Sequence, residues 1–292
     1  MKLGFMTNVL VKYGMKDFHD VASWAEENGF DCLEVGPTIP LDEELYRDVL
    51  AKHNVAVSAL TYCRNFLSSD PEEAKGHVEE LKKRIRFASK LGIEKVVTST
   101  GIDKRVEEGI YDTADSIRRT PRRSLDLFEE TFTPIVELAK DCHVKIAFEN
   151  CPIMGNIAIS PVMWREIFKR FDTEWVGLTY DPSHLVWQMI DPYEHIAEFA
   201  PKIVHVHAKD MHVDFKALHE TGFLTDFDWW HARIPGQGDV DWNRLFTELK
   251  KNGFDNSVSI EHEDHNYEGT LEKVEEGILW SKNYLTPIIK GE

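Results

Sequence analysis

The chain has 292 residues, of which 42% are hydrophobic and 29% are charged, a balance that is typical of a packed globular protein and excludes a disordered chain. Its 34 lysines and arginines against 51 aspartates and glutamates give a formal charge of −17, which opposes binding to nucleic acid. Every apolar run is shorter than the ~18 residues that a membrane-spanning helix needs, so we expect no membrane partner.

Short apolar runs rich in β-branched residues alternate with helical patterns along the whole chain, which indicates parallel βαβ units. The predicted strands, in chain order, are Leu3–Thr7, Cys32–Val35, Ala56–Thr61, Lys95–Ser99, Lys145–Glu149, Val176–Tyr180, Ile203–His207 and Ser257–Glu261. Eight such units, at a length that a single barrel domain can have, predict one (β/α)8 TIM barrel domain over residues 1–292.

The helices between these strands are predicted from their apolar periodicity. One helix carries its apolar residues at Phe18, Val21, Ala22 and Ala25. The alternative for eight βα units is an open, doubly wound sheet, which would usually have a glycine-rich phosphate turn after its first strand. Residues 6–9 contain no glycine, so the closed barrel is favoured.

Two connections are long, about residues 101–121 after the fourth strand and about residues 210–240 after the seventh. In a barrel both would lie on the catalytic face, where loops confer specificity. The first connection contains the basic run 118–123, which could attract an anionic group of a substrate.

Four consecutive predicted strands end in side chains that can bind a metal: Glu149, Asp181, His207 and Glu261. A single acidic residue at such a place could simply cap a strand or a helix. Four strand ends in succession would meet at one mouth of a barrel, which favours one divalent metal. Three carboxylates and one imidazole suit Mn²⁺ first, with Mg²⁺, Co²⁺ or Zn²⁺ as alternatives.

Three further residues lie near this set in the sequence. His184 follows Asp181 in a turn-forming segment, where its imidazole could lie over the metal or pack within the loop. Lys209 shares a strand side with His207 and could reach a substrate oxygen or form a structural ion pair. His205, on the same side, is expected to lie deeper in the barrel.

The chain resembles the xylose isomerase-like TIM barrel superfamily, the sugar phosphate isomerase/epimerase family that includes ketose 3-epimerase-like enzymes. The resemblance covers essentially the whole chain. It is carried by Phe148-Glu149-Asn150, Tyr180-Asp181-Pro182-Ser183-His184-Leu185, His205-Val206-His207-Ala208-Lys209-Asp210, Arg233-Ile234-Pro235-Gly236-Gln237-Gly238 and Ser259-Ile260-Glu261.

The resemblance to the ketose 3-epimerase branch implies roles for these residues. Glu149 and Glu261 would bind metal and exchange protons with the substrate, and Asp181 and His207 would complete the metal shell. His184 would contact a substrate oxygen. Arg233, just before the Pro-Gly-Gln-Gly turn, would contact a hydroxyl or stabilise an enediolate.

These observations predict a metal-dependent isomerase or epimerase of a sugar, cyclitol or related polyhydroxy ketone. The alternatives are a dehydratase or carbon–oxygen lyase on a keto-sugar, inosose or 3-keto-glycoside, and a barrel that binds sugar without catalysis. An endonuclease IV-like repair nuclease is disfavoured, because the third and fourth strands end without the histidines of a three-zinc cluster.

The remaining expectations concern the setting of the protein. The N-terminus lacks the basic and apolar regions of a secretory signal, and we expect a cytoplasmic protein. Cys32, Cys63, Cys142 and Cys151 lack CxxC spacing and are expected to be reduced thiols. An apolar stripe over residues 271–279 fits a homo-oligomer contact, or simply packing on the barrel.

Overall fold

The computed structural model describes residues 1–103, 121–153 and 155–291. The chain divides into two compact units, one formed by Met1–Ser58 with Tyr180–Glu292, the other by Ala59–Thr179. The long connection predicted at about 101–121 lies almost entirely outside the described residues, and so does half of its basic run.

All eight predicted strands are present, and their ends agree with the prediction to within one residue. They are β1 (Lys2–Met6), β2 (Cys32–Val35), β3 (Ala56–Tyr62), β4 (Lys95–Thr98), β5 (Lys145–Glu149), β6 (Val176–Tyr180), β7 (Ile203–Ala208) and β10 (Ser257–Ile260). The strand pairs within each unit are parallel, as βαβ units require.

The first unit contains four of these strands in the order β2-β1-β10-β7. His207 of β7 is in register with Ser259 of β10, so the residues that follow the two strands emerge side by side. The helices of this unit are α1 (Asn8–Lys12), α2 (Phe18–Glu27), α3 (Glu43–Lys52), α8 (Ser183–Val186), α9 (Ile196–Phe199), α10 (Phe215–Thr225), α11 (Trp242–Lys251), the 3-10 helix η2 (His265–Tyr267) and α12 (Leu271–Lys290).

Local sequence signals set the ends of these helices. The side chain of Asp17 accepts a hydrogen bond from the backbone of His19 at the start of α2, and Gly29 follows that helix with a φ of +66°. In α12, Val274 and Ile278 are fully buried, and the helix packs on β1 and β10 of the same unit. The apolar stripe of α12 therefore packs within the chain.

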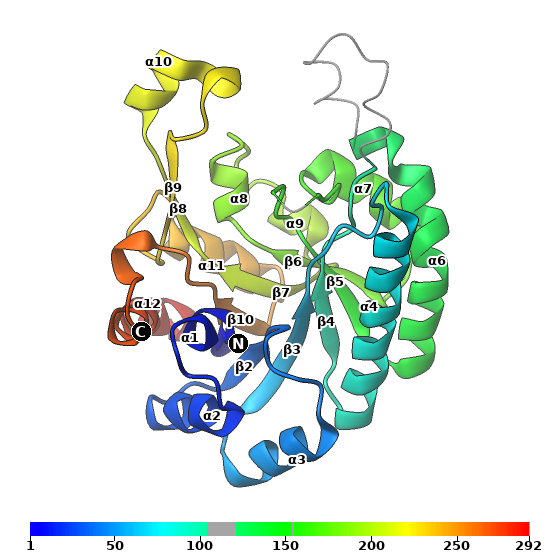
Figure 1. The fold of residues 1–292 in the computed structure, drawn as a ribbon. Coiled ribbons are helices and arrows are strands. Elements are labelled where there is room, and N and C mark those ends of the chain that lie inside the picture. Colours follow the sequence, from blue (N-terminus) through cyan, green and yellow to red (C-terminus); the bar gives the residue numbers. More distant parts are fainter. Residues whose placement is uncertain (104–120, 154, 292) are drawn as a thin grey trace. The chain divides into compact units, whose positions relative to one another are not determined.

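The second unit carries β3, β4, β5 and β6 in that order, with α4 (Pro71–Leu91), α6 (Leu125–Cys142) and α7 (Pro161–Arg170). Helices α4 and α6 lie side by side (Figure 1). The ring of Phe132 lies 4.9 Å from Phe128 and 5.2 Å from Phe148 of β5, between ring centroids. This aromatic core fixes β5, and with it Glu149 at the end of that strand.

The segment that we expected to be a long loop at about 210–240 is partly regular. An antiparallel hairpin, β8 (Asp210–Val213) with β9 (Trp230–Arg233), carries α10 at its outer end (Figure 1). Its core is Trp229 packed with Val213 and Leu218. The prediction missed this hairpin because its two strands are short and separated by a helix, so no tight-turn signal joins them.

No disulfide joins the four cysteines. Cys32, Cys63 and Cys151 are buried, and Cys142 is partly exposed. Within the described part of the chain, no helix combines the length and the apolar composition needed to cross a membrane.

Candidate metal and active site

The carboxyl end of β7 provides a row of three buried side chains. His205, His207 and Lys209 follow one another at intervals of two residues, and strand geometry therefore turns them to the same side. All three are at most 2% exposed. His205 was expected to lie deeper than His207, and its ring contacts Ser257 at the start of β10.

Glu34 of β2, which the sequence analysis did not single out, lies against this row. Its Oε2 atom is 2.8 Å from Nε2 of His205, and both of its carboxylate oxygens are 3.0 Å from Nε2 of His207. The signal that could have found it is an acidic residue inside a short, otherwise apolar strand, since a buried carboxylate needs partners.

The two histidines keep Glu34 ionised. Burial by itself would raise the pKa of Glu34, but the interactions with His207 and His205 outweigh burial and lower this pKa well below its usual value. The carboxylate is therefore available as an acceptor for both imidazole rings at neutral pH.

Three of the four predicted metal ligands come together in the first unit. Ligand atoms of Asp181, His207 and Glu261 lie within 4.8 Å of one another. Nδ1 of His207 is 3.3 Å from Oε2 of Glu261. Asp181 directly follows β6 and Glu261 directly follows β10, so these two candidate ligands lie at strand ends, as the sequence predicts.

The ammonium group of Lys209 lies among the same carboxylates. Nζ is 2.8 Å from Oε2 of Glu261, 3.2 Å from Oδ2 of Asp181 and 3.2 Å from Oε2 of Glu263. The structural ion pair, one of the two roles considered for Lys209, is therefore present. Two carboxylates and an imidazole are donors that fit a divalent cation.

Glu261 is ionised in this environment. Burial would raise its pKa, but the charges of Lys209 and His207 outweigh burial, and the pKa of Glu261 falls below its usual value. An ionised carboxylate beside a candidate metal site can both bind a cation and accept a proton.

His184 lies at the start of α8 and is 2% exposed. Trp187 donates its indole N–H to Nδ1 of His184 at 3.2 Å, and Nε2 of His184 lies 3.5 Å from Oδ2 of Asp181. Burial, with the charge of Lys209, lowers the pKa of His184 well below its usual value, so the ring is neutral. Because Nδ1 accepts a hydrogen bond, Nε2 carries the proton and can donate.

Arg233 ends β9 and is held by Asp264, whose Oδ1 lies 3.5 Å from the guanidinium. The turn that follows Arg233 is fixed by Asp210, which accepts hydrogen bonds from the backbone of Gly236 and Val240 and from the indole of Trp242. A Cβ atom at position 238 would collide with Asp210, which explains the second glycine of this turn.

Glu149 belongs to the second unit, where it ends β5 and is 3% exposed. The thiol of Cys63 donates to Oε2 of Glu149 at 3.5 Å. Asn156 donates to the main-chain carbonyl of Glu149 at 2.6 Å and fixes the chain where it leaves the strand. Glu149 thus has the strand-end position that the sequence predicts.

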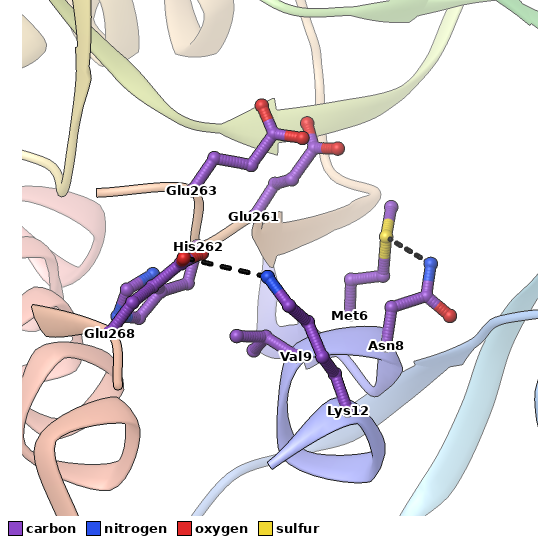
Figure 2. Close-up of a pocket in the computed structure, with 8 residues that line it drawn as sticks. All are labelled: Met6, Asn8, Val9, Lys12, Glu261, His262, Glu263 and Glu268. Carbon is purple, nitrogen blue, oxygen red and sulfur yellow. Dashed lines mark hydrogen bonds and ion pairs between the residues drawn. The ribbon is translucent and has the colours of Figure 1, made fainter. Parts of the chain in front are cut away.

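A pocket of about 170 Å³ opens beside Glu261 in the first unit. Figure 2 shows Lys12 of α1 reaching across it to Glu268, 3.4 Å away, while the carboxylates of Glu261 and Glu263 point to the same side. The pocket is lined by Met6, Asn8, Val9, Lys12, Glu261, His262, Glu263 and Glu268. A lining that combines these hydrogen-bonding groups with the apolar side chains of Met6 and Val9 is suited to a polar small molecule.

Residues 22–284 match the xylose isomerase-like TIM barrel family, and the chain belongs to this family. The predicted (β/α)8 barrel fold and the predicted family are thereby confirmed. In solved structures, the chain is similar to the IOLI protein with a bound zinc atom, with a TM-score of 0.73, 23% identity and coverage of 100% of this chain and 99% of that one.

Two of the other similar proteins carry names that refer to enzymes. A solved structure of a D-tagatose 3-epimerase-like protein matches with a TM-score of 0.72 and 23% identity. The match covers 99% of this chain and 97% of that protein's chain. Inosose dehydratase of Clostridium perfringens (strain 13 / Type A) is 24% identical, covering 80% of this chain and 78% of its own. "Uncharacterized protein YfiH" of Bacillus subtilis (strain 168) is 30% identical, and the match covers 90% of this chain and 93% of that protein. The two enzyme names belong to the predicted class, isomerase/epimerase, and to its predicted alternative, lyase.

Proposed function

We propose that the protein is a divalent-metal-dependent isomerase or epimerase of a sugar, cyclitol or related polyhydroxy ketone, which acts by proton abstraction through an enediolate. The observation that carries this proposal is the grouping of Asp181, His207 and Glu261 within 4.8 Å, with an ionised Glu261. The similar D-tagatose 3-epimerase-like protein supports the same class of reaction.

The proposed metal shell consists of Asp181, His207 and Glu261 with Glu149 as the fourth ligand, so that residues 1–292 act as one domain. An oxygen-rich shell favours Mn²⁺ over zinc, although the zinc atom of the IOLI protein keeps zinc among the ions to test. When bound, the ion would act as a Lewis acid that stabilises negative charge on substrate oxygens.

The chain's own residues would move the proton. Glu261, as a carboxylate, takes a proton from the carbon beside the carbonyl, and Glu149 delivers a proton to the opposite face. Return to the same carbon from that face gives epimerisation, whereas return to the neighbouring carbon gives isomerisation. Nε2–H of His184 would donate to a substrate oxygen.

Arg233 and Lys209 would supply positive charge to the oxygens of the substrate. Asp264 holds Arg233 at the end of β9, and Lys209 is paired with Asp181 and Glu261. The pocket beside Glu261 would accept the part of the substrate that does not react.

A second candidate is a metal-dependent dehydratase or carbon–oxygen lyase, favoured by the similarity to inosose dehydratase. After the same proton abstraction, a β-hydroxyl would take a proton and leave as water, or a glycosidic oxygen would leave as an alcohol. The first step needs the same carboxylate, so the two candidates differ only in what happens to the enediolate.

The test is to incubate the protein and Mn²⁺ with ketoses, aldoses, inososes and 3-keto-glycosides in deuterated water. The first candidate is supported by an epimer or isomer that contains deuterium and otherwise has the same mass as the substrate. A product lighter by one water, or a released alcohol, supports the second. Absence of deuterium uptake and of product from every compound contradicts both.

A further inference from the structure

Glu34 connects two histidines through a chain of buried hydrogen bonds. Ser257 Oγ lies 2.8 Å from Nδ1 of His205, and Nε2 of the same ring lies 2.8 Å from Oε2 of Glu34. The other carboxylate oxygen of Glu34, Oε1, lies 3.0 Å from Nε2 of His207. Glu34 and both histidines are fully buried, and Ser257 is 5% exposed.

The donors and acceptors of this chain can be assigned one by one. An ionised carboxylate only accepts, so Nε2 of His205 and Nε2 of His207 must both donate to Glu34. When the site holds a cation, each imidazole is neutral and carries one proton, which leaves Nδ1 of each ring with a lone pair. In His205 that lone pair accepts from the hydroxyl of Ser257. In His207 it faces Oε2 of Glu261, 3.3 Å away.

From this geometry we propose that Glu34 is a positioning residue of the metal site, which fixes the tautomer and the ring orientation of His207 so that Nδ1 can bind the cation. The inference rests on the proposed function, because it assigns His207 as a ligand. A carboxylate behind a metal-binding histidine orients the ring and makes it a stronger donor.

Glu34→Gln is the sharpest test, because it keeps the size of the side chain and changes its hydrogen bonding. An amide has one oxygen acceptor, so it can satisfy only one of the two N–H groups well, and its NH₂ group favours an Nε2 acceptor in the other ring. In His207 such a change would move the proton to Nδ1 and block the lone pair needed for a metal.

The matched control is Ser257→Ala, which removes a hydrogen bond from the same buried chain on the side away from His207. Titration calorimetry with Mn²⁺ alone measures the dissociation constant of each variant. We expect an increase of about 10–100-fold for Glu34→Gln and less than about 2-fold for Ser257→Ala. Equal affinities for Glu34→Gln and the wild type would overturn the proposal.

A second measurement does not depend on the folding of the variant or on bound metal. The ¹⁵N chemical shifts of His207 in the metal-free wild type report which ring nitrogen is protonated. A proton on Nε2 is expected whether or not Nδ1 is also protonated, and an Nε2 without a proton would overturn the role of Glu34. If the wild type binds no divalent cation at all, the proposed function fails, while the tautomer still decides the role of Glu34.

Discussion

Lys209 and Glu261 form a buried ion pair, with 2.8 Å between Nζ and Oε2, at the place where the first unit gathers its candidate metal ligands. The ammonium group is also within 3.2 Å of Asp181. Lys209 thus supplies positive charge to the same two carboxylates that a divalent cation would neutralise.

Lys209→Met should destabilise the metal-free protein by about 3–5 kcal/mol, because it leaves Asp181 and Glu261 buried without their cation. Added Mn²⁺ should recover more stability in the variant than in the wild type, since the ion replaces the lost charge. Urea unfolding with and without Mn²⁺ measures both effects. Lys12→Met, at an exposed ion pair, serves as the control with a change of about 0–1 kcal/mol. Unchanged stability of Lys209→Met would contradict the prediction.

The proposed acid/base roles of Glu149 and Glu261 predict that both variants lose turnover but that only one of them loses hydrogen exchange. Glu149→Gln and Glu261→Gln should each reduce product formation by at least about 100-fold, because each removes one proton-transfer group. Glu149→Gln keeps Glu261, the abstracting carboxylate, and should still exchange substrate hydrogen for deuterium. Glu261→Gln should not exchange it. Mass spectrometry and NMR of the recovered ketose distinguish them, and full exchange with full turnover in both variants would reject the assignment.

Lys12 should affect substrate binding more than chemistry, because it lines the pocket beside Glu261 without belonging to the metal shell. Lys12→Ala should raise KM roughly 5–20-fold and leave kcat within about 2-fold, as expected for the loss of one charged hydrogen bond to the substrate. Steady-state kinetics measure the two constants. Lys2→Ala, at the opposite end of β1, is the control, and an unchanged KM for Lys12→Ala would show that the pocket is not used.

Much of the site could be predicted from the sequence, since strand ends in a βα alternation are readable from periodicity. Asp181, His207, Glu149 and Glu261 all lie within one residue of a strand end, as expected. The acidic residue in the short apolar strand β2 signals that Glu34 needs buried partners, but it does not reveal that these partners are His205 and His207. That pairing depends on the barrel interior, where β2 and β7 face one another across two intervening strands.

The role of Lys209 was similarly open. Its side of the strand could be predicted from its spacing to His207, but the choice between a substrate contact and an ion pair depends on the positions of Asp181 and Glu263, which come from other segments of the chain. The hairpin β8–β9 escaped prediction for a different reason, because the helix α10 between its strands obscures their pairing in the sequence.

Asp210 should be a structural rather than a chemical residue. Its carboxylate accepts four hydrogen bonds, from Met211, Gly236, Val240 and Trp242, which hold the turn after Arg233. Asp210→Asn replaces two acceptor positions by a donor and should cost about 2–5 kcal/mol of stability. Trp242→Phe removes one bond and should cost about 1–3 kcal/mol. Equal urea midpoints for Asp210→Asn and the wild type would contradict this account.

Removal of the metal tests the central claim most directly. Protein purified without added metal is analysed for bound ions, then assayed for deuterium uptake into a ketose or inosose before chelation, after chelation and after Mn²⁺ is restored. The account predicts about one divalent ion per chain, loss of exchange with the chelator and recovery with Mn²⁺. Exchange that persists in protein shown to be free of metal would contradict it, as would about three zinc ions per chain without exchange.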